Sequence, residues 1–253
     1  MKIYSYLLKI RPTFIISFLK KILRIKRKEL ITDKGIFYID PISNFGTTLL
    51  MENVYEPEMV KTIEDIISVD DSFFDLGANE GYFSVLAAKI IGGKGLVYAV
   101  EPQSRLQEIV ARNFKTNKID NYRIIQKAIS NKEGTIQLSL APDTNTGSSG
   151  LFNVQKYKNP TEVVHMTTLE RLFNDEKIKN IKLMKVDIEG LEYEAILGSQ
   201  NLFKQNVIEN IALELHPSII EKRNNRVNDI IDFLSEAGYK VNNKYPTLVY
   251  SKK

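Results

Sequence analysis

Short apolar runs alternate with helical patterns along most of the chain from Asp71 onward. Between the runs, apolar residues recur every three or four positions, which is the spacing of an amphipathic helix. Strands that alternate with helices at this spacing predict a parallel sheet with helices on both faces. The predicted parallel strands are Ser72–Leu76, Leu96–Val100, Tyr122–Gln126, Lys182–Ile188 and Ile208–Leu215.

The pattern changes near the end of this region. The last two predicted strands, Tyr239–Asn242 and Thr247–Ser251, follow each other across a short turn that contains Asn243 and Pro246. Two strands joined by a short turn pair antiparallel, so the far edge of the sheet is expected to be antiparallel.

A long insertion separates the third and fourth predicted strands. It contains two further predicted strands, Thr135–Leu140 and Val163–Met166, with a loop of small residues between them. A long loop inside a compact domain is often functional, so Asn145–Ser149 is expected to cover the acceptor side of a site. Thr167 and Glu170 have the spacing of a capping box, which predicts the start of a helix.

A smaller unit precedes the alternating region. Ile36–Asp40 and Thr47–Val54 are β-like runs on either side of a loop with proline and glycine, which predicts a hairpin. Pro57 then opens a helical pattern. The chain therefore divides into an N-terminal segment (1–34), a hairpin and helix (35–70) and a main domain (71–253).

Charge is distributed unevenly. Residues 1–28 carry nine Lys and Arg and no acidic residue, whereas the remaining 225 residues carry 26 basic and 31 acidic groups, a net charge of −5. Thr13–Ile25 has a helical apolar period, but its longest uncharged run is eight residues, far below the roughly 20 that span a bilayer. The segment either docks on the body or makes a peripheral contact with a membrane surface. Nucleic acid is not expected as a partner, because no base-reading motif accompanies the charge.

Composition excludes several kinds of site. The absence of cysteine rules out disulfides, a zinc ribbon and a thiol nucleophile. It is compatible with a cytoplasmic location, where the basic segment leaves open a peripheral contact with the cytoplasmic face of the membrane. The two histidines, His165 and His216, are too few for a multi-histidine metal cage. A carboxylate-rich site for a hard cation stays open.

The turn after the first main strand carries the clearest candidate chemistry. Asp75 is followed by Gly77 and Gly81, which allow backbone to approach a ligand closely at the carboxyl end of a strand. The turn has neither the dinucleotide fingerprint nor the P-loop lysine, so a pyrophosphate or a nucleoside triphosphate is disfavoured. An acidic turn suits a ligand with an amino group and a ribose. Glu101, at the end of the next strand, has two acceptor oxygens that match a vicinal diol.

Several motifs occur together in one order. They are FFDLGANEGYFS (73–84), VEPQSRL (100–106), KAIS (127–130), GTIQLSL (134–140), KVDIEGLEYEAILG (185–198) and ALELHP (212–217). In this combination the chain resembles the S-adenosylmethionine-dependent methyltransferases of the FkbM family. The resemblance implies an α/β fold with a Rossmann-like sheet of seven strands, mostly parallel with an antiparallel last strand and helices on both faces. The first 30 residues lie outside it.

The resemblance also implies where the cofactor binds. Gly77, Asn79 and Gly81 are expected to line its methionine and ribose, Glu101 to hold the ribose, and Lys127 and Ala128 to lie beside the adenine. The full set expected at the cofactor is Asp75, Gly77, Ala78, Asn79, Gly81, Tyr82, Glu101, Pro102, Lys127 and Ala128.

Three residues are candidates for catalysis. His216 is the first candidate for a general base, because the ordinary pKa of histidine lies near neutrality. Asp187 is the second, or it orients His216, and Glu189 lies nearby by topology. Asp187 and Glu189 are also an alternative pair of ligands for Mg²⁺ or another divalent cation, although no metal ligand is assigned. His165 lies in an edge-like run and is interpreted as structural.

The sequence therefore predicts a methyltransferase that acts on a hydroxyl of a sugar, a glycan or a similar small polar acceptor. Two alternatives stay open. One is a non-catalytic cofactor-binding or membrane-surface scaffold domain, and the other is methyl transfer to protein or RNA. The net negative charge of the body argues against RNA, because affinity for RNA depends on neutralising phosphates.

Overall fold

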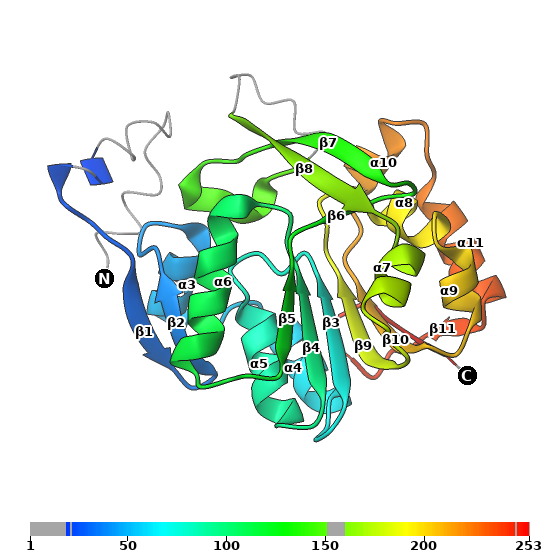
Figure 1. Ribbon diagram of the computed structural model, residues 1–253, viewed down its shortest axis with the longest axis horizontal. Helices are drawn as coiled ribbons and strands as arrows, with labels where there is room; N and C mark the ends of the chain where they lie inside the picture. Colours follow the sequence, from blue (N-terminus) through cyan, green and yellow to red (C-terminus); the bar gives the residue numbers. More distant parts are fainter. Residues whose placement is uncertain (1–18, 21, 151–159, 246, 253) are drawn as a thin grey trace.

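A twisted sheet of seven strands forms the centre of the protein (Figure 1). The computed structural model describes residues 19–20, 22–150, 160–245 and 247–252. The sheet order is β11-β12-β10-β9-β3-β4-β5. Its strands are β3 (Ser72–Leu76), β4 (Leu96–Val100), β5 (Tyr122–Ile125), β9 (Ile181–Val186), β10 (Ile208–Leu213), β11 (Tyr239–Val241) and β12 (Val249–Lys252).

Strand directions confirm the predicted fold class. Neighbouring strands from β10 to β5 pair parallel, β12 pairs antiparallel with β10, and β11 pairs antiparallel with β12. The far edge of the sheet, formed by β11 and β12, is therefore antiparallel as expected, with β12 between β10 and β11. The chain winds outward from β3 to β5 and then crosses to β9 on the other side of β3. This reversal is the kind of place where open α/β sheets bind ligands.

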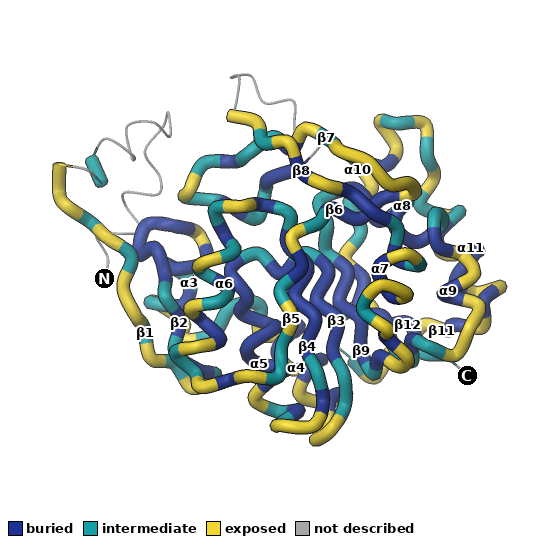
Figure 2. Tube along the Cα trace, in the orientation of Figure 1, coloured by how far each residue is buried: buried dark blue, intermediate teal, exposed yellow. Residues whose placement is uncertain are grey.

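Helices cover both faces of the sheet because successive side chains of each strand point to opposite faces. Phe73 packs with α4, α5 and α6, whereas its neighbour Phe74 packs with α7, α8, α9 and α11. Figure 1 shows these two helical layers, and Figure 2 shows the buried strands between them. The helices are α4 (Pro57–Ile66), α5 (Tyr82–Ile91), α6 (Ser104–Thr116), α7 (Leu169–Asp175), α8 (Glu192–Leu197), α9 (Gln200–Lys204), α10 (Pro217–Glu221) and α11 (Val227–Glu236).

The N-terminal unit differs from the expected hairpin. The predicted strand at Thr47–Val54 is wrong, because α3 (Asn44–Glu52) occupies this region. Ser43 caps its first turn by accepting a hydrogen bond from the backbone of Gly46, and Asn53 ends it in the left-handed conformation. The strand β2 (Gly35–Ile39) pairs instead with β1 (Lys28–Thr32), inside the segment predicted to be only basic and amphipathic.

The insertion forms a second, three-stranded sheet near the end of β5. It consists of β6 (Ala128–Ile129), β7 (Gly134–Ser139) and β8 (Thr161–Thr167), with the 3₁₀ helix η1 (Asp143–Ser148) between β7 and β8. The capping box is wrong by one residue, because Thr168 rather than Thr167 accepts the bond from Arg171 that starts α7. His165 is exposed on β8, away from the pocket described below.

Most of the predicted amphipathic helix at Thr13–Ile25 lies outside the described residues. In the part of the chain that is described, no helix has the length and apolar character needed to cross a bilayer.

Candidate functional site

A pocket opens where β3, β4 and β9 end, at the reversal of strand order. One part is lined by the turn after β3 and by Glu101, where the cofactor is expected, and is called the cofactor part below. The other part is lined by Asp187, Glu189 and Glu214, where the acceptor is expected, and is called the acceptor part. Of the predicted site residues, those that line the pocket are Gly77, Ala78, Asn79, Tyr82, Glu101, Pro102, Lys127, Ala128, Asp187 and Glu189. Asp75, Gly81 and His216 do not line it.

The turn after β3 is held in a conformation that favours glycine. Gly77, Asn79 and Gly81 all have positive φ angles, of 88°, 48° and 80°. A Cβ atom at Gly77 would lie 1.8 Å from the carbonyl oxygen of Asp187, so a side chain has no room there. The absence of a side chain at Gly77 therefore lets the turn pack directly against the backbone at the end of β9, at the edge of the pocket.

Glu101 lies at the end of β4 and is only 4% exposed. Its two oxygens accept hydrogen bonds from the backbone N–H groups of Asn79 (3.0 Å) and Gln103 (2.9 Å). Burial raises its pKa to about 7, against the lowering effect of those two donors. Each oxygen keeps a free lone pair, so the buried carboxylate fits a ligand that brings two hydroxyl donors.

Asp75 is fully buried below the pocket instead of facing it. Ser84 donates a hydrogen bond to one of its oxygens (2.6 Å), and the ammonium of Lys185 lies 3.6 Å from the other. Lys185, itself 1% exposed, also reaches Asp187 (3.3 Å) and the carbonyl of Gly77 (3.4 Å). Burial acts to lower the pKa of Lys185, but the charges of Asp187 and Asp75 outweigh it and raise that pKa. Asp75 therefore positions Lys185 under the turn.

The loop Asn145–Ser149, expected to cover the acceptor side, instead contacts the part of the pocket formed by the turn after β3 and Glu101. Thr146 donates to the side chain of Asn79 (2.9 Å), and its carbonyl accepts from Gln103 (3.3 Å). Arg105 fastens the loop from α6 through Asp143 (2.9 Å) and the carbonyl of Ala141. These contacts associate η1 with the residues expected to hold the cofactor.

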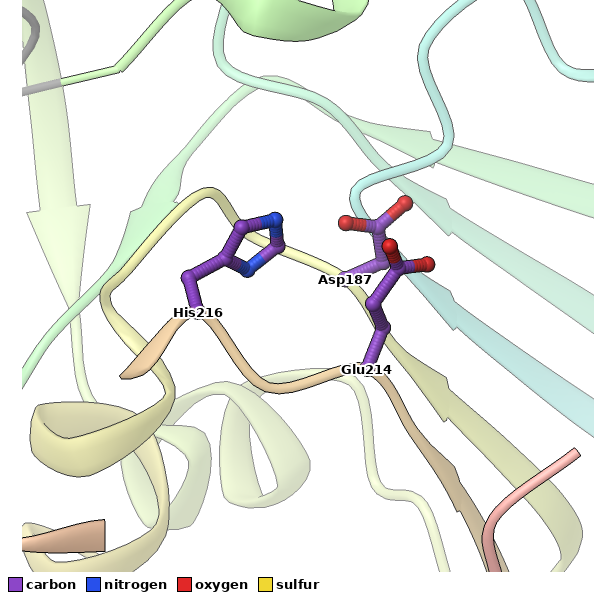
Figure 3. Close-up of side chains that lie close together, drawn as sticks. All are labelled: Asp187, Glu214 and His216. Atoms are coloured by element: carbon purple, nitrogen blue, oxygen red, sulfur yellow. The ribbon is translucent and has the colours of Figure 1, made fainter. Parts of the chain in front are cut away.

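Three side chains from two adjacent strand ends meet at the acceptor part (Figure 3). Asp187 follows β9, and Glu214 and His216 follow β10. One ligand atom from each lies within 4.8 Å of the others, so among the described residues this group could hold a metal ion. Glu189, the partner expected for Asp187, instead faces His216, with 3.8 Å between a carboxylate oxygen and Nε2.

The electrostatics of this group are set by burial and crowding. Glu192, whose side chain is fully buried, accepts a hydrogen bond from Nδ1 of His216 (2.9 Å), and this contact raises the pKa of the imidazole to about 9. Burial raises the pKa of Glu189 to about 7, opposed by His216, and burial also raises that of Glu214. At neutral pH the imidazole of the free protein therefore carries a proton, so it serves as a base only after releasing it.

Several charged or polar residues of the pocket were not predicted from the sequence, among them Glu56, Glu80, Gln103, Lys185 and Glu214. A lysine inside an otherwise apolar parallel strand was a usable signal for Lys185. Glu214 can be recognised as a site residue only from the register between β9 and β10. Val186 lies opposite Leu213, so the residues that follow them, Asp187 and Glu214, lie side by side.

The sequence match decides the family. The family profile described as "Methyltransferase FkbM domain" matches residues 75–241, about two thirds of the chain. The chain belongs to the FkbM methyltransferase family. This FkbM domain contains all strands of the main sheet except β12 and the first residues of β3. It is a methyltransferase domain with S-adenosylmethionine as methyl donor, and the glycine turn and buried Glu101 fit that cofactor.

No curated protein matches this chain in sequence. Among solved structures, M. jannaschii TYW2 in complex with AdoMet is 15% identical, with 89% of this chain and 85% of that chain covered and a TM-score of 0.45. A SAM-dependent methyltransferase from Aquifex aeolicus is 14% identical, with coverages of 81% and 92% and a TM-score of 0.43. Precorrin-6y C5,15-methyltransferase from Geobacter metallireducens GS-15 is 12% identical, with coverages of 79% and 90% and a TM-score of 0.44. At this level of similarity the family assignment depends on the FkbM profile alone.

Proposed function

We propose that this protein transfers a methyl group from S-adenosylmethionine to a hydroxyl of a sugar, a glycan or a similar small polar acceptor. The observation that carries the proposal is the group formed by Asp187, Glu214 and His216 beside the glycine turn. A hydroxyl is a poor nucleophile and gains from a nearby proton acceptor. The aromatic rings of Phe45 and Tyr55 line the same pocket. Rings that contact a ligand's apolar surface, together with carboxylates that accept from its hydroxyls, suit an acceptor with several hydroxyl groups.

The residues divide the work as follows. The bound cofactor supplies an electrophilic methyl group, so the protein mainly aligns the acceptor oxygen and removes its proton. Asp187 replaces His216 as the first candidate for the proton acceptor, because the raised pKa of His216 keeps the imidazole protonated and because Asp187 lies against the turn after β3. The backbone N–H of Asp187 donates to the carbonyl of Leu76 (3.0 Å), and its own carbonyl lies next to Gly77. His216 lies one strand farther from the turn, with Nδ1 occupied by Glu192.

A divalent cation such as Mg²⁺ stays a prediction. Its expected ligands become Asp187, Glu214 and His216, in place of the pair Asp187 and Glu189. Such an ion would bind the acceptor hydroxyl and make it more acidic. Titration of the protein with Mg²⁺, in the presence and absence of S-adenosylhomocysteine, tests this prediction without an acceptor.

The decisive experiment is an acceptor screen. The purified chain is incubated with S-adenosylmethionine and a panel of sugars and glycans, and S-adenosylhomocysteine and methylated product are measured by mass spectrometry. Asp187→Asn should lower kcat by about 10²–10⁴-fold while leaving the affinity for S-adenosylhomocysteine nearly unchanged. The matched control is Glu209→Gln, which makes the same change from acid to amide at an exposed carboxylate that pairs with Lys182.

Three outcomes would contradict the proposal. Asp187→Asn with a wild-type rate would remove the assigned proton acceptor. Methylation of protein or RNA, with none of the small polar acceptors modified, would favour the alternative acceptor class. Cofactor binding without transfer to any acceptor would favour the scaffold alternative, in which residues 1–28 make a membrane contact.

A further inference from the structure

The basic N-terminal segment reaches the turn that borders the cofactor part of the pocket. Arg27, just before β1, makes two parallel hydrogen bonds to Glu80, from Nη1 to Oε2 (2.7 Å) and from Nη2 to Oε1 (2.9 Å). This forked pairing is the strong, directional form of an arginine–carboxylate contact. Arg27 lies outside residues 75–241, which match the family, whereas Glu80 lies inside them.

Glu80 depends on this partner. Its side chain is 1% exposed, and that of Arg27 is 17% exposed, so the pair is largely shielded from water. A buried carboxylate that loses its cation is left with an uncompensated charge. The backbone carbonyl of Glu80 is held separately by the side chain of Asn113 (2.8 Å), which also accepts from Tyr38 of β2. Side chain and backbone of Glu80 are thus fixed from the N-terminal hairpin and from α6.

The contact continues directly to Glu101. Asn79, the neighbour of Glu80, has a left-handed backbone (φ 48°) that a non-glycine residue adopts only when its surroundings hold it. In that conformation its N–H donates to Glu101 (3.0 Å). Movement of Glu80 out of its buried position would shift the peptide group between Asn79 and Glu80, and through Asn79 it would disturb the preceding peptide group, whose N–H donates to Glu101.

The segment around Arg27 is tied down at two further points. Nη1 of Arg27 donates to the carbonyl of Tyr38 (3.2 Å), and Lys20 forms an ion pair with the buried side chain of Asp40. Lys20 and Arg27 therefore use their charges in contacts with the body of the protein.

We propose that Arg27 is a positioning residue for the cofactor: through Glu80 it holds the turn Gly77–Gly81 in the conformation that binds S-adenosylmethionine. A residue of the N-terminal segment thereby supports a turn that belongs to the family domain. The inference goes beyond the proposed function, because it concerns cofactor binding and does not depend on the acceptor.

The test compares Arg27→Ala and Arg27→Lys with Arg112→Ala in the full chain. Arg112 is a matched control, because it ties the same hairpin to α6 through Glu29 (3.0 Å) and the ring of Tyr38, without touching the turn. Calorimetry with S-adenosylhomocysteine should show affinity about tenfold or more weaker for Arg27→Ala, an intermediate loss for Arg27→Lys, which keeps the charge but lacks the fork, and a change within about twofold for Arg112→Ala.

Two additional measurements separate positioning from general stability. Once an acceptor is known, the KM for S-adenosylmethionine should rise in Arg27→Lys while kcat at saturating cofactor stays within about threefold. In a Glu80→Gln background, Arg27→Met should weaken binding by little more than Glu80→Gln alone, because both act through one contact.

Affinity within twofold of wild type in both Arg27→Ala and Arg27→Lys would overturn the inference, as would an equal loss in Arg112→Ala. Should Arg27→Ala fail to fold, Arg27→Lys and the Glu80→Gln background decide the question. Wild-type protein that binds S-adenosylhomocysteine but methylates no hydroxyl acceptor would refute the proposed function and leave the inference on Arg27 intact.

Discussion

The pKa of Glu101 leads to a pH dependence of cofactor binding. In the free protein, burial raises this pKa to about 7, so near neutrality about half of the molecules carry a protonated side chain. Only the ionised carboxylate accepts from both hydroxyls of a ribose. A ligand that selects the ionised form should therefore bind more tightly as the pH rises through 7, and its binding should release protons at lower pH.

The size of the effect follows from the ionised fraction. With a pKa of about 7, about one tenth of the protein is ionised at pH 6 and about nine tenths at pH 8. The apparent Kd scales inversely with the competent fraction, so it should be about tenfold weaker at pH 6 than at pH 8 and level above pH 8.

The assay is calorimetric titration from pH 5.5 to 8.5 with 5′-methylthioadenosine. This ligand keeps the adenine and the ribose but lacks the amino acid part, so its own ammonium group does not titrate. Two buffers with different protonation enthalpies measure the protons released. Glu101→Gln should bind about 10- to 100-fold more weakly at pH 8, because it loses charge-assisted hydrogen bonds, and its affinity should be independent of pH.

Equal wild-type affinities at pH 6 and pH 8 would refute the reasoning about Glu101. A pH dependence of the same slope in Glu101→Gln would assign the titration to another group in the pocket.

Further predictions concern the turn, the N-terminal unit and the loop. Gly77→Ala places a Cβ atom against the carbonyl of Asp187 at a positive φ angle and should lower the unfolding free energy by about 3 kcal/mol or more in urea titrations. Ser43→Ala removes the cap of α3 and should cost about 1 kcal/mol by the same measurement, with cofactor affinity unchanged. Arg105→Ala removes the contacts that fasten η1 and should speed hydrogen exchange in that loop, whereas protection of the central strands should stay as in the wild type.

The sheet was predictable because its central strands are apolar on both faces and its helices are apolar on one. β3 and β4 match the predicted bounds, and β9 and β10 begin and end within two residues of them. The prediction of a strand at Thr47–Val54 failed because the β-branched and apolar residues of this run suit a strand or a helix. The capping by Ser43 and the left-handed Asn53 decide for a helix, in which Phe45 and Leu49 lie on one buried face.

The site was predictable only where it follows from strand ends. Glu101 and Asp187 come directly after apolar strands, and the carboxyl ends of parallel strands meet at one edge. Asp75 was expected at the cofactor, but it lies buried below the pocket, because Lys185 and Ser84 fill the space around it. The contact of Arg27 with Glu80 joins positions 53 residues apart through a hairpin that was not predicted, so no local pattern indicates it.

The pairing of β9 with β3 has a consequence for how the chain reaches its native state. β3, β4 and β5 are consecutive and can assemble from a contiguous stretch, but the partner on the other edge of β3 arrives much later, with 108 positions between Gly77 and Lys185. Until then the apolar edge of β3 stays open, which is the situation in which a growing chain pairs with the wrong strand or with another molecule. The long separation between β3 and β9 therefore predicts that the junction that forms the pocket is completed late and slowly during folding.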